Sequence, residues 1–546
     1  MHNKKYYLVS PRVDGVTIQG FIETMFEQHI VMMGWGTDNK IGADFNNLNK
    51  GDFVIVAQRV NWVFTYYFAG IIDDEQGFSN DDGILCRKLR SFIDLRGYNG
   101  DFLANASFAS MSAIKAMMNI NPSNNIEIIK KLDKIIAMQE NKDYVNSFVS
   151  LLKSNHNLIL TGAPGTGKTF LAKEIAKSMG AKYKLVQFHP SYDYTDFVEG
   201  LRPIKEGGTL GFHRKDGVFK AFCKEAILKV KELVKEVYNR SYQEIQDEKL
   251  PEIPVGKGRT KRTFCGDNGQ WGLTTGKERK NGILGDLSYL ASIEKLVDFG
   301  FINNSQLESF DGNIREIIGG NDTDIKNVLC YLFDRIGSNV PLYIFIIDEI
   351  NRGEISKIFG ELFYSIDSGY RGIKGRVETQ YQNLVPKDDV FSNGFYVPEN
   401  VYIIGTMNDI DRSVESMDFA MRRRFAWKEV TVESRLSMLD EEDAWGSEGK
   451  PSQDIIDEMK VRMANLNNAI IDKYGDETLS NKDKIGLTKA YQIGAAYFLK
   501  YALYNNFEEL WINHLQGLLY EYLRGKTNIE EKIERLRNAY NDTTQH

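Results

Sequence analysis

The chain has 546 residues, 42% of them hydrophobic and 26% charged, which excludes globally disordered, collagen-like and fibrous proteins. At roughly 100 to 200 residues per domain, this length predicts three or four folding units. The formal net charge of −7 argues against a generally basic coat for nucleic acid, so any DNA contact should be local.

No apolar run approaches the roughly 20 residues of a membrane-spanning helix, and the first residues lack the apolar stretch of a secretory signal. We therefore expect a cytoplasmic protein with no membrane segment. The four cysteines are widely spaced and form no CxxC pair, so neither a disulfide framework nor a zinc site is predicted.

The first 120 residues predict a compact β-rich domain. Its strand-like runs are Tyr6–Ser10, Phe53–Gln58 and Phe64–Ile72, separated by turns rich in Gly, Asn and Asp. A polar breaker at 119–125 is followed by apolar residues at helical spacing, so we place a domain boundary there.

Helices and strands alternate from about residue 126 to residue 430. The predicted elements are strands at Leu158–Leu160, Lys184–Phe188, Tyr343–Ile347 and Val401–Gly405 and a helix over 168–178. Continuous apolar strands between helices are typical of a parallel sheet covered on both faces, so we expect an α/β fold. From 431 to 546 helical periodicity dominates, which predicts a helical lid subdomain.

A glycine-rich motif lies between the first of these strands and the helix that follows it. The pattern GxxxxGK[ST] is formed by Gly162, Ala163, Pro164, Gly165, Thr166, Gly167, Lys168 and Thr169. This context is typical of a phosphate-binding loop, whose backbone N–H groups and helix N-terminus surround the phosphates. Lys168 would place a charge on the β- and γ-phosphates, and Thr169 would offer its hydroxyl to Mg²⁺.

Two carboxylates follow another apolar strand. Asp348 and Glu349 come directly after Tyr343–Ile347, at the strand end where α/β sheets bind ligands. Alone, such a pair is usual for a solvated strand end, but together with the phosphate loop it predicts a nucleoside triphosphatase. Asp348 would hold Mg²⁺ through water, and Glu349 would polarise the attacking water.

An asparagine and three consecutive arginines come after the strand Val401–Gly405. Asn408, at the end of a strand next to the Asp-Glu strand, can reach the γ-phosphate or the lytic water. Arg422, Arg423 and Arg424 end an apolar helix and have two interpretations. They form either a solvated basic helix end or an arginine finger that acts on a neighbouring subunit's nucleotide and so requires an oligomer.

The order of phosphate loop, Asp-Glu strand and arginine-bearing helix resembles an AAA+ ATPase module. Met407–Ser413 is similar to the signature of the McrB family, the motor subunits of modification-dependent restriction systems. Other segments that resemble McrB proteins are Val186–Tyr192, Asp196–Phe197, Gly200–Pro203, Asp348–Gly353 and Ile493–Phe498. The resemblance covers most of residues 140 to 510. In the last segment Ala495 stands where relatives often carry a polar residue, which puts the role of this lid motif in doubt.

The resemblance implies a hexameric ring that hydrolyses nucleotide at subunit interfaces and works on DNA with a separate McrC-type endonuclease. By motif, Asn408 and Asp411 would position the water, Arg412 would support their loop, and Arg423 and Arg424 would act in trans. McrB proteins prefer GTP, but the residues here leave GTP and ATP both open as the substrate. We find no nuclease signature in the sequence and expect the partner to cut the DNA.

The spacing of the nucleotide motifs departs from a simple AAA+ module. The lysine of the phosphate loop lies 180 positions before Asp348, which predicts an insertion between about 230 and 335. Within it, residues 251–282 hold seven Lys and Arg against three Asp and Glu, with Phe264 and Trp271 interleaved. This basic segment has two interpretations, a DNA- or partner-binding element or a mobile solvated loop.

The N-terminal domain carries a second, independent resemblance. Its segments Tyr6–Ser10, Gly34–Gly36, Lys50–Val54 and Phe68–Ile72 are similar to those of an EVE domain of the PUA and YTH-like superfamily. In McrB-like proteins the N-terminal domain selects modified DNA. The resemblance therefore implies that a modified base is flipped out of double-stranded DNA and held between aromatic faces.

Aromatic residues of this domain are the candidates for base stacking. Trp35 and Trp62 are the predicted stacking residues, with Phe64, Tyr66 and Tyr67 as further candidates. The alternative is that these rings fill a β-core, which we favour for Phe64 and Tyr66. Trp35 lies between glycines, as in a loop, and this favours stacking.

Two other functions stay open. An AAA+ chaperone of the MoxR type would remodel protein partners, with the N-terminal domain as an adaptor. A modified-nucleic-acid binding module would use its ring only to oligomerise, and the intact Lys168, Glu349 and Asn408 argue against it. The Met407–Ser413 signature favours the restriction motor, and stimulation of hydrolysis by DNA or by a nuclease would discriminate between them.

Overall fold

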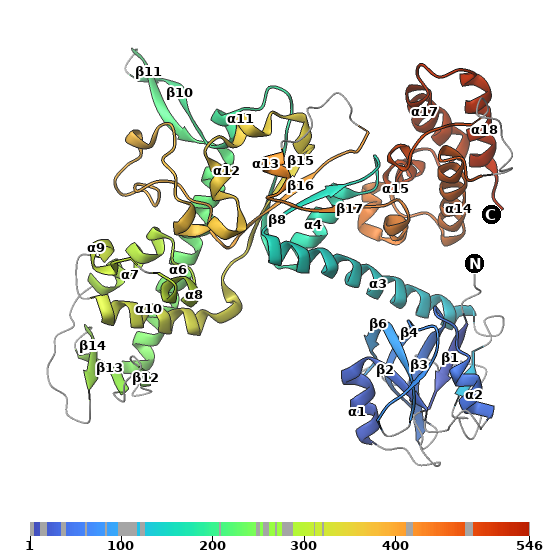
Figure 1. Ribbon diagram of the computed structural model, residues 1–546, viewed down its shortest axis with the longest axis horizontal. Coiled ribbons are helices and arrows are strands. Elements are labelled where there is room, and N and C mark those ends of the chain that lie inside the picture. Colours follow the sequence, from blue (N-terminus) through green and yellow to red (C-terminus); the bar gives the residue numbers. More distant parts are fainter. Residues whose placement is uncertain are drawn as a thin grey trace. The chain divides into compact units, whose positions relative to one another are not determined.

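The computed structural model describes most of the chain in two compact units, Met1–Ser147 and Phe148–His546 (Figure 1). Residues outside the description are 1–4, 11–18, 34–39, 61–62, 82–83, 97–116, 121–125, 207–208, 247–251, 255–260, 268–269, 276–287, 311, 319–321, 411–418, 475–483 and 545–546. Among the described residues, no helix has both the length and the apolar character needed to cross a bilayer.

The first unit is built on one seven-stranded sheet. Its strands are β1 (Tyr6–Val9), β2 (Ile30–Met33), β3 (Phe53–Val60), β4 (Val63–Ile72), β5 (Phe78–Ser79), β6 (Leu85–Asp94) and β7 (Met117–Asn119), with helices α1 (Gln19–Gln28) and α2 (Lys40–Asn46). The strand order is β2-β6-β4-β3-β1-β7, and β5 pairs with β6. Phe53 and Ile55 of β3 join one apolar cluster while Val54 and Val56 join another, because successive side chains of a strand point to opposite faces. The β-rich domain expected from the sequence is thus a sheet with a core on each face.

The helix α3 (Ile126–Asn155) completes the first unit and continues into the second. Ile136 is buried in the same cluster as Tyr6, whose hydroxyl donates to the Asp133 carboxylate at 2.5 Å. Arg90 of β6 also pairs with Glu140 at 2.9 Å. Because these contacts hold the first half of α3 against the sheet, the unit ends within α3 rather than at the polar breaker at 119–125.

The second unit contains a five-stranded sheet in which every pair of neighbours is parallel. Its strands are β8 (Asn157–Thr161), β9 (Lys182–Gln187), β15 (Tyr343–Asp348), β16 (Val401–Thr406) and β17 (Ala426–Glu429), in the order β17-β8-β16-β15-β9. The helix α4 (Lys168–Ser178) follows β8 and contacts β9, β15 and β16. The α/β fold with a parallel sheet, predicted from the apolar strands, is confirmed.

A long excursion separates α6 (Val218–Gln246) from β15. It contains β12 (Glu252–Pro254), β13 (Lys261–Asp267), β14 (Gln270–Thr275), α7 (Ser288–Phe299), α8 (Asn304–Glu308), α9 (Ile314–Ile318) and α10 (Asp322–Ile336). Leu296 of α7 and Leu332 of α10 belong to the same apolar cluster as Phe345 of the sheet, so the helical part is an extension of the sheet's core. The described residues of the basic segment 251–282 form the antiparallel sheet β12-β13-β14, which corrects the solvated-loop interpretation for those strands.

Further helices of the second unit come before and after this insertion in the chain. They are α5 (Tyr194–Phe197), α11 (Ile355–Phe359), α12 (Leu362–Ser365), α13 (Phe419–Arg422), α14 (Gln453–Ile470), α15 (Ala495–Phe498), α16 (Phe507–Leu510), α17 (Gln516–Tyr522) and α18 (Ile529–Asn541). The C-terminal helices share their own core, with Trp511 and Tyr540 fully buried in it. The residues after 430 are therefore mainly helical, as expected from their periodicity.

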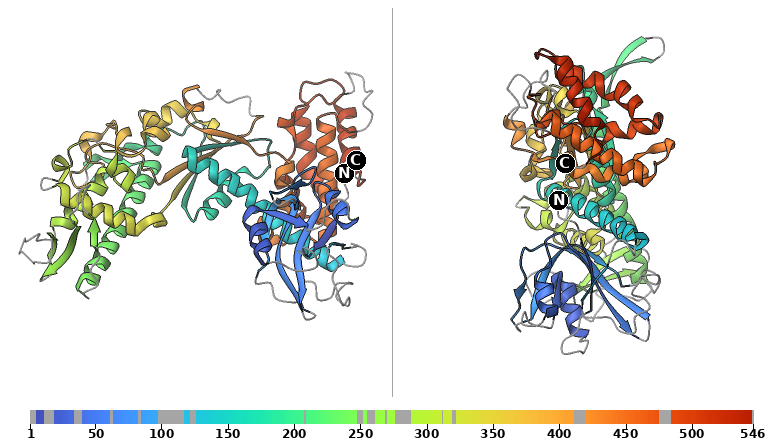
Figure 2. Two further views of the ribbon diagram at one scale, coloured as in Figure 1. Left: turned by 60° about the horizontal axis from the view of Figure 1, so that its bottom comes forward. Right: turned by 90° about the vertical axis from the view of Figure 1, so that its right-hand side faces the viewer.

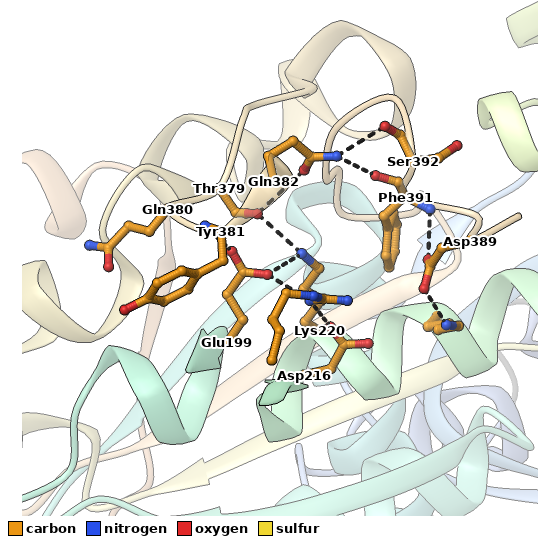
Figure 3. A network of polar contacts seen from close by, with 12 residues as sticks. Glu199, Asp216, Lys220, Thr379, Gln380, Tyr381, Gln382, Asp389, Phe391 and Ser392 are labelled. Atoms are coloured by element: carbon orange, nitrogen blue, oxygen red, sulfur yellow. Dashed lines mark hydrogen bonds and ion pairs between the residues drawn. The ribbon is translucent and has the colours of Figure 1, made fainter. Parts of the chain in front are cut away.

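A β-hairpin projects from the second unit, and its base is fixed by a buried ionic network (Figures 1, 2 and 3). The strands β10 (Glu199–Glu206) and β11 (Thr209–Asp216) form the hairpin. The fully buried Glu199 carboxylate accepts from the Lys220 ammonium, the Arg214 guanidinium and the Tyr381 amide, each at 2.8 Å. Burial alone would raise the pKa of Glu199, but hydrogen bonds with Lys220, Thr379 and Tyr381 lower it below its usual range, so the group stays charged.

We expect Glu199→Ala to lower the free energy of unfolding by roughly 3 kcal/mol or more, because it leaves the buried Lys220 ammonium without its counter-ion. Asp196→Ala is the matched control, since Asp196 pairs with Arg202 at the surface and should contribute less than about 1 kcal/mol. Urea denaturation of the full chain measures both values. Equal effects of the two substitutions would contradict a structural role for the buried network.

Candidate nucleotide site

The phosphate loop joins β8 to α4 and depends on three glycines with positive φ. Gly162, Gly165 and Gly167 have φ angles of 140°, 75° and 78°, which disfavour any residue with a Cβ. A Cβ at Gly162 would also lie 2.4 Å from the Val430 carbonyl oxygen, and one at Gly167 would lie 2.7 Å from the Met438 sulfur. The loop can therefore take this path only with glycine at these positions, next to the N-terminus of α4, where anions are stabilised.

The lysine of the loop is held within the loop itself. Lys168 is buried, and its ammonium donates to the carbonyl oxygens of Gly162 and Ala163 at 3.0 and 2.8 Å. The Thr166 hydroxyl donates to the Ala163 carbonyl at 3.0 Å. A positive charge is thus fixed at the centre of the loop, beside the backbone N–H groups that begin α4.

One carboxylate joins three elements at the carboxyl edge of the sheet. Oδ1 of Asp348, at the end of β15, accepts from the Thr169 hydroxyl of α4 at 2.6 Å and from the Thr406 hydroxyl of β16 at 2.6 Å. Carboxylate and hydroxyl oxygens are the hard ligands that Mg²⁺ prefers, and Thr169 directly follows the phosphate-binding lysine. The residues present therefore fit a magnesium ion bound beside a triphosphate.

The second carboxylate contacts the predicted asparagine. The Asn408 amide donates to Oε1 of Glu349 at 2.6 Å, and the Arg352 guanidinium lies 3.5 Å from the other carboxylate oxygen. Glu349 has φ 50° and ψ 48°, a left-handed backbone that costs free energy and is common at functional sites. Its own amide donates to the Thr406 hydroxyl at 3.2 Å. Glu349 and Asn408 therefore lie together at the edge that carries the phosphate loop.

Thr406 was not identified from the sequence as a site residue. It sits one residue beyond the pairing of Ile347 with Gly405, so the parallel register places it beside Asp348. Only the order of the strands in the sheet could have indicated this, because Thr406 and Asp348 are far apart in the chain and no local motif joins them.

The lid motif Ile493–Phe498 contacts the phosphate loop through its backbone. The Gly494 amide donates to the Pro164 carbonyl at 3.0 Å, and the Ala496 amide donates to the Gly165 carbonyl at 2.9 Å. A Cβ at Gly494 would lie 2.2 Å from the Thr166 nitrogen. Because both hydrogen bonds come from the main chain, this contact does not need a polar side chain at position 495.

We expect Gly494→Ala to weaken nucleotide binding at least about tenfold, since the added methyl displaces either the lid motif or the phosphate loop. Gly517→Ala in α17 is the matched control, because a Cβ at that position would have no described atom within 4 Å and alanine favours a helix. Titration with a fluorescent nucleotide analogue gives both dissociation constants. A Gly494→Ala protein that binds as tightly as the control would contradict this contact.

The three arginines lie at the amino ends of the strands, opposite the phosphate loop. Helix α13 ends at Arg422, and the other two arginines follow it before β17. The strand β17 runs parallel to β8, with Ala426 beside Leu158 and Glu429 beside Thr161. A strand of this length spans about 13 to 17 Å at about 3.3 Å per residue, so the arginines and the phosphate loop are at opposite strand ends. Arg422 and Arg423 are exposed, whereas the Arg424 side chain packs over Phe363 and near Asp367.

A buried arginine links the phosphate-loop helix to the start of the lid. Arg435 is fully buried, and its guanidinium lies 2.8 Å from Glu174 of α4 and 3.9 Å from Glu441. One cation therefore faces two carboxylates, with Glu174 the closer. Burial, and then the charge of Glu174, raise the pKa of Glu441 to about 7, against the opposing effect of Arg435.

This pKa predicts a pH dependence of stability. Because the folded protein holds the Glu441 proton more tightly than the unfolded chain, the contribution of Glu441 to stability falls as pH rises from about 4.5 to about 7. The carboxylates Glu174, Asp440 and Asp443 and the Arg435 guanidinium are the charges that act on it. We expect Glu441→Gln, which mimics the neutral acid, to remove this component from the melting temperature measured between pH 5 and 8. A variant whose profile parallels that of the unmodified chain would contradict the assignment.

The contacts of several predicted site residues are outside what the structure describes. Asp411 and Arg412 lie outside the described residues, as do Trp35 and Trp62. Only the backbone of Phe64 is described, in β4. Tyr66 is buried in the core, while the hydroxyl of Tyr67 donates to Gln58 at 2.9 Å.

Comparisons with known proteins agree with the geometry of the second unit. The sequence matches the AAA domain of the dynein-related subfamily over residues 157–257 and 335–425, so the chain contains an AAA domain. It is 27% identical over 364 residues to the Type IV methyl-directed restriction enzyme EcoKMcrB subunit of Escherichia coli K12, over 65% of this chain. It is 19% identical over 323 residues to the Type II restriction enzyme BsuMI component YdiS of Bacillus subtilis 168, over 58% of this chain.

Each of these matches covers only part of the sequences compared. The alignment spans 50% of the E. coli subunit and 69% of the B. subtilis component. The match to the AAA domain is interrupted between residues 257 and 335, within the insertion expected from the spacing of the nucleotide motifs. An AAA domain implies a nucleoside triphosphatase that uses Mg²⁺ and a nucleotide.

Proposed function

We propose that this chain is the GTP-hydrolysing ring motor of a restriction system that recognises modified DNA and drives a separate endonuclease of the McrC type. The observation that carries the proposal is the cluster of Lys168, Asp348, Glu349 and Asn408 at one sheet edge, in a chain similar to restriction-system subunits. The activity requires a nucleotide, a magnesium ion and a positioned water, and this cluster offers groups for each.

In this proposal each site residue has a role that follows from its position. Lys168 and the N-terminus of α4 bind the β- and γ-phosphates, while Thr169 and Asp348 hold Mg²⁺, which when bound neutralises charge on the phosphate oxygens. Glu349 accepts a proton from the attacking water and Asn408 orients that carboxylate through its 2.6 Å hydrogen bond. In this proposal Asp411 helps to position the water and Arg412 supports their loop, as the McrB resemblance implies.

The position of the arginines supports action between subunits. Arg423 is exposed at the strand end opposite the phosphate loop, too far to reach the nucleotide of its own chain. It can therefore stabilise a transition state only on a second copy, which makes a ring with interfacial sites the simplest assembly. Arg424 is largely covered by Phe363 and contributes mainly to holding this segment in place.

The N-terminal unit is proposed to select the DNA. In this proposal Trp35, Trp62 and Phe64 stack on a modified base that has left the duplex, and an EVE-like fold presents them. The relative from E. coli is named as methyl-directed, which supports a methylated base as the target.

Nucleotide hydrolysis by the purified chain tests the proposal. We expect GTP hydrolysis to exceed ATP hydrolysis, to rise when a McrC-type partner is added, and to fall at least about 100-fold in Glu349→Gln. Glu354→Gln is a matched control, because Glu354 is an exposed carboxylate five residues further along the chain. A rate of ATP hydrolysis that does not change when the McrC-type partner is added would overturn the restriction-motor proposal and favour a MoxR-type chaperone.

A further inference from the structure

A buried asparagine lies at the amino end of β8, beside the arginine segment. Asn157 is the first residue of β8, and no part of it is exposed. Its side-chain nitrogen donates to the carbonyl oxygens of Ile366 at 2.6 Å and of Arg424 at 2.9 Å. Its side-chain oxygen accepts from the guanidinium of Arg371, which is itself buried. The amide thus uses both its donor and its acceptor capacity inside the protein.

Arg422 is the last residue of α13, where helix carbonyl groups have no partner within the helix, and Arg424 lies two residues beyond it. Side chains from outside the helix satisfy them here. The Trp427 indole N–H donates to the Arg422 carbonyl at 3.0 Å, and Asn157 donates to the Arg424 carbonyl. The carbonyl groups on both sides of Arg423 are therefore fixed, so its exposed side chain projects from a backbone that cannot turn freely.

The other end of β8 leads directly into the phosphate loop. The five residues of β8 run from Asn157 to the residue before Gly162, and the strand is held between β16 and β17 by parallel ladders. The Gly162 carbonyl in turn accepts from the Lys168 ammonium at 3.0 Å. One short strand, paired on both sides, therefore connects the backbone of Arg423 with the group that binds phosphate.

We propose that Asn157 is a positioning residue that holds Arg423 in the orientation needed to act on the neighbouring subunit's nucleotide. This inference rests on the proposed trans action of Arg423.

Asn157→Asp is the selective variant. An aspartate keeps the acceptor for Arg371 and nearly the same shape, but it cannot donate to the carbonyls of Ile366 and Arg424. Asn400→Asp is the matched control. Asn400 is also a buried asparagine at the amino end of a strand, but its nitrogen donates to the Pro341 carbonyl at 2.8 Å and not to a carbonyl beside Arg423.

The experiment is a double-mutant cycle on the full-length protein, with kcat for GTP and ATP hydrolysis, nucleotide affinity and melting temperature measured for each variant. We expect Asn157→Asp to lower kcat about tenfold or more while nucleotide affinity changes less than about threefold, because the subunit's own phosphate loop is intact. In an Arg423→Ala background, Asn157→Asp should cause no further loss, since both changes remove the same interaction. Asn400→Asp should leave kcat near that of the unmodified chain.

Trp427→Phe provides a second variant if Asn157→Asp fails to fold. It removes the other donor beside Arg423, at a partly exposed position, and should lower kcat in the same way. If the kcat losses of Asn157→Asp and Arg423→Ala multiply in the double variant, or if Asn400→Asp loses as much kcat as Asn157→Asp, the role of Asn157 is overturned. The trans action of Arg423 would then still stand. An Arg423→Ala protein with unchanged kcat would overturn both.

Discussion

The interaction on which the nucleotide site depends is the pair of hydroxyl contacts to Oδ1 of Asp348. Through them, a single oxygen at the end of β15 ties the phosphate-loop helix at Thr169 to the end of β16 at Thr406. Thr406 also accepts from the Glu349 amide, so the left-handed turn that places the second carboxylate rests on the same contact. Moving β15 or α4 would separate the Asp348 carboxylate from Thr169 and Lys168, the groups proposed to bind Mg²⁺ and phosphate.

Because all strands of the sheet run in the same direction, the carboxylates and Arg423 lie at opposite ends of the strands. The strands of this sheet all end at the edge that holds the phosphate loop, Asp348 and Asn408, and all begin at the edge that holds Arg423. Under the proposed action of Arg423, a subunit would not complete its own site, because the strands keep its arginine away from its phosphate loop. In the proposed ring a second copy would supply that arginine, and β8 is the strand that leads from the Asn157 contacts to the phosphate loop.

The sequence predicted the parts of the site that are local in the chain. The phosphate loop, the Asp348-Glu349 pair and the strands before them could be found because each is a short motif flanked by a recognisable strand or helix. Thr406, Gly494 and Arg435 could not be found in this way, since their contacts join segments that meet only in the folded chain. The doubt over the lid motif came from Ala495, which stands where relatives often carry a polar residue, whereas the contact with the phosphate loop is made by backbone amides. The sheet order, which places β16 between β8 and β15, decides most of these neighbours, and no pattern along the sequence encodes it directly.

The same polarity explains how the site tolerates the insertion. The inserted elements run from the end of α6 to the start of β15, and the start of a parallel strand lies at the edge away from the nucleotide. The helices α7 and α10 extend the core that already lies against Phe345, so they add apolar contacts on one face without entering the phosphate-loop edge. The hairpin β10–β11 differs, because it follows the carboxyl end of β9 and so emerges on the nucleotide side of the sheet. Its buried Glu199 network fixes the direction of an element that starts near the site, while the insertion, which starts far from it, is joined mainly through an apolar core. Hydrogen bonds to a charged group are directional and apolar contacts are not, so the Glu199 network gives the base of the hairpin a defined orientation.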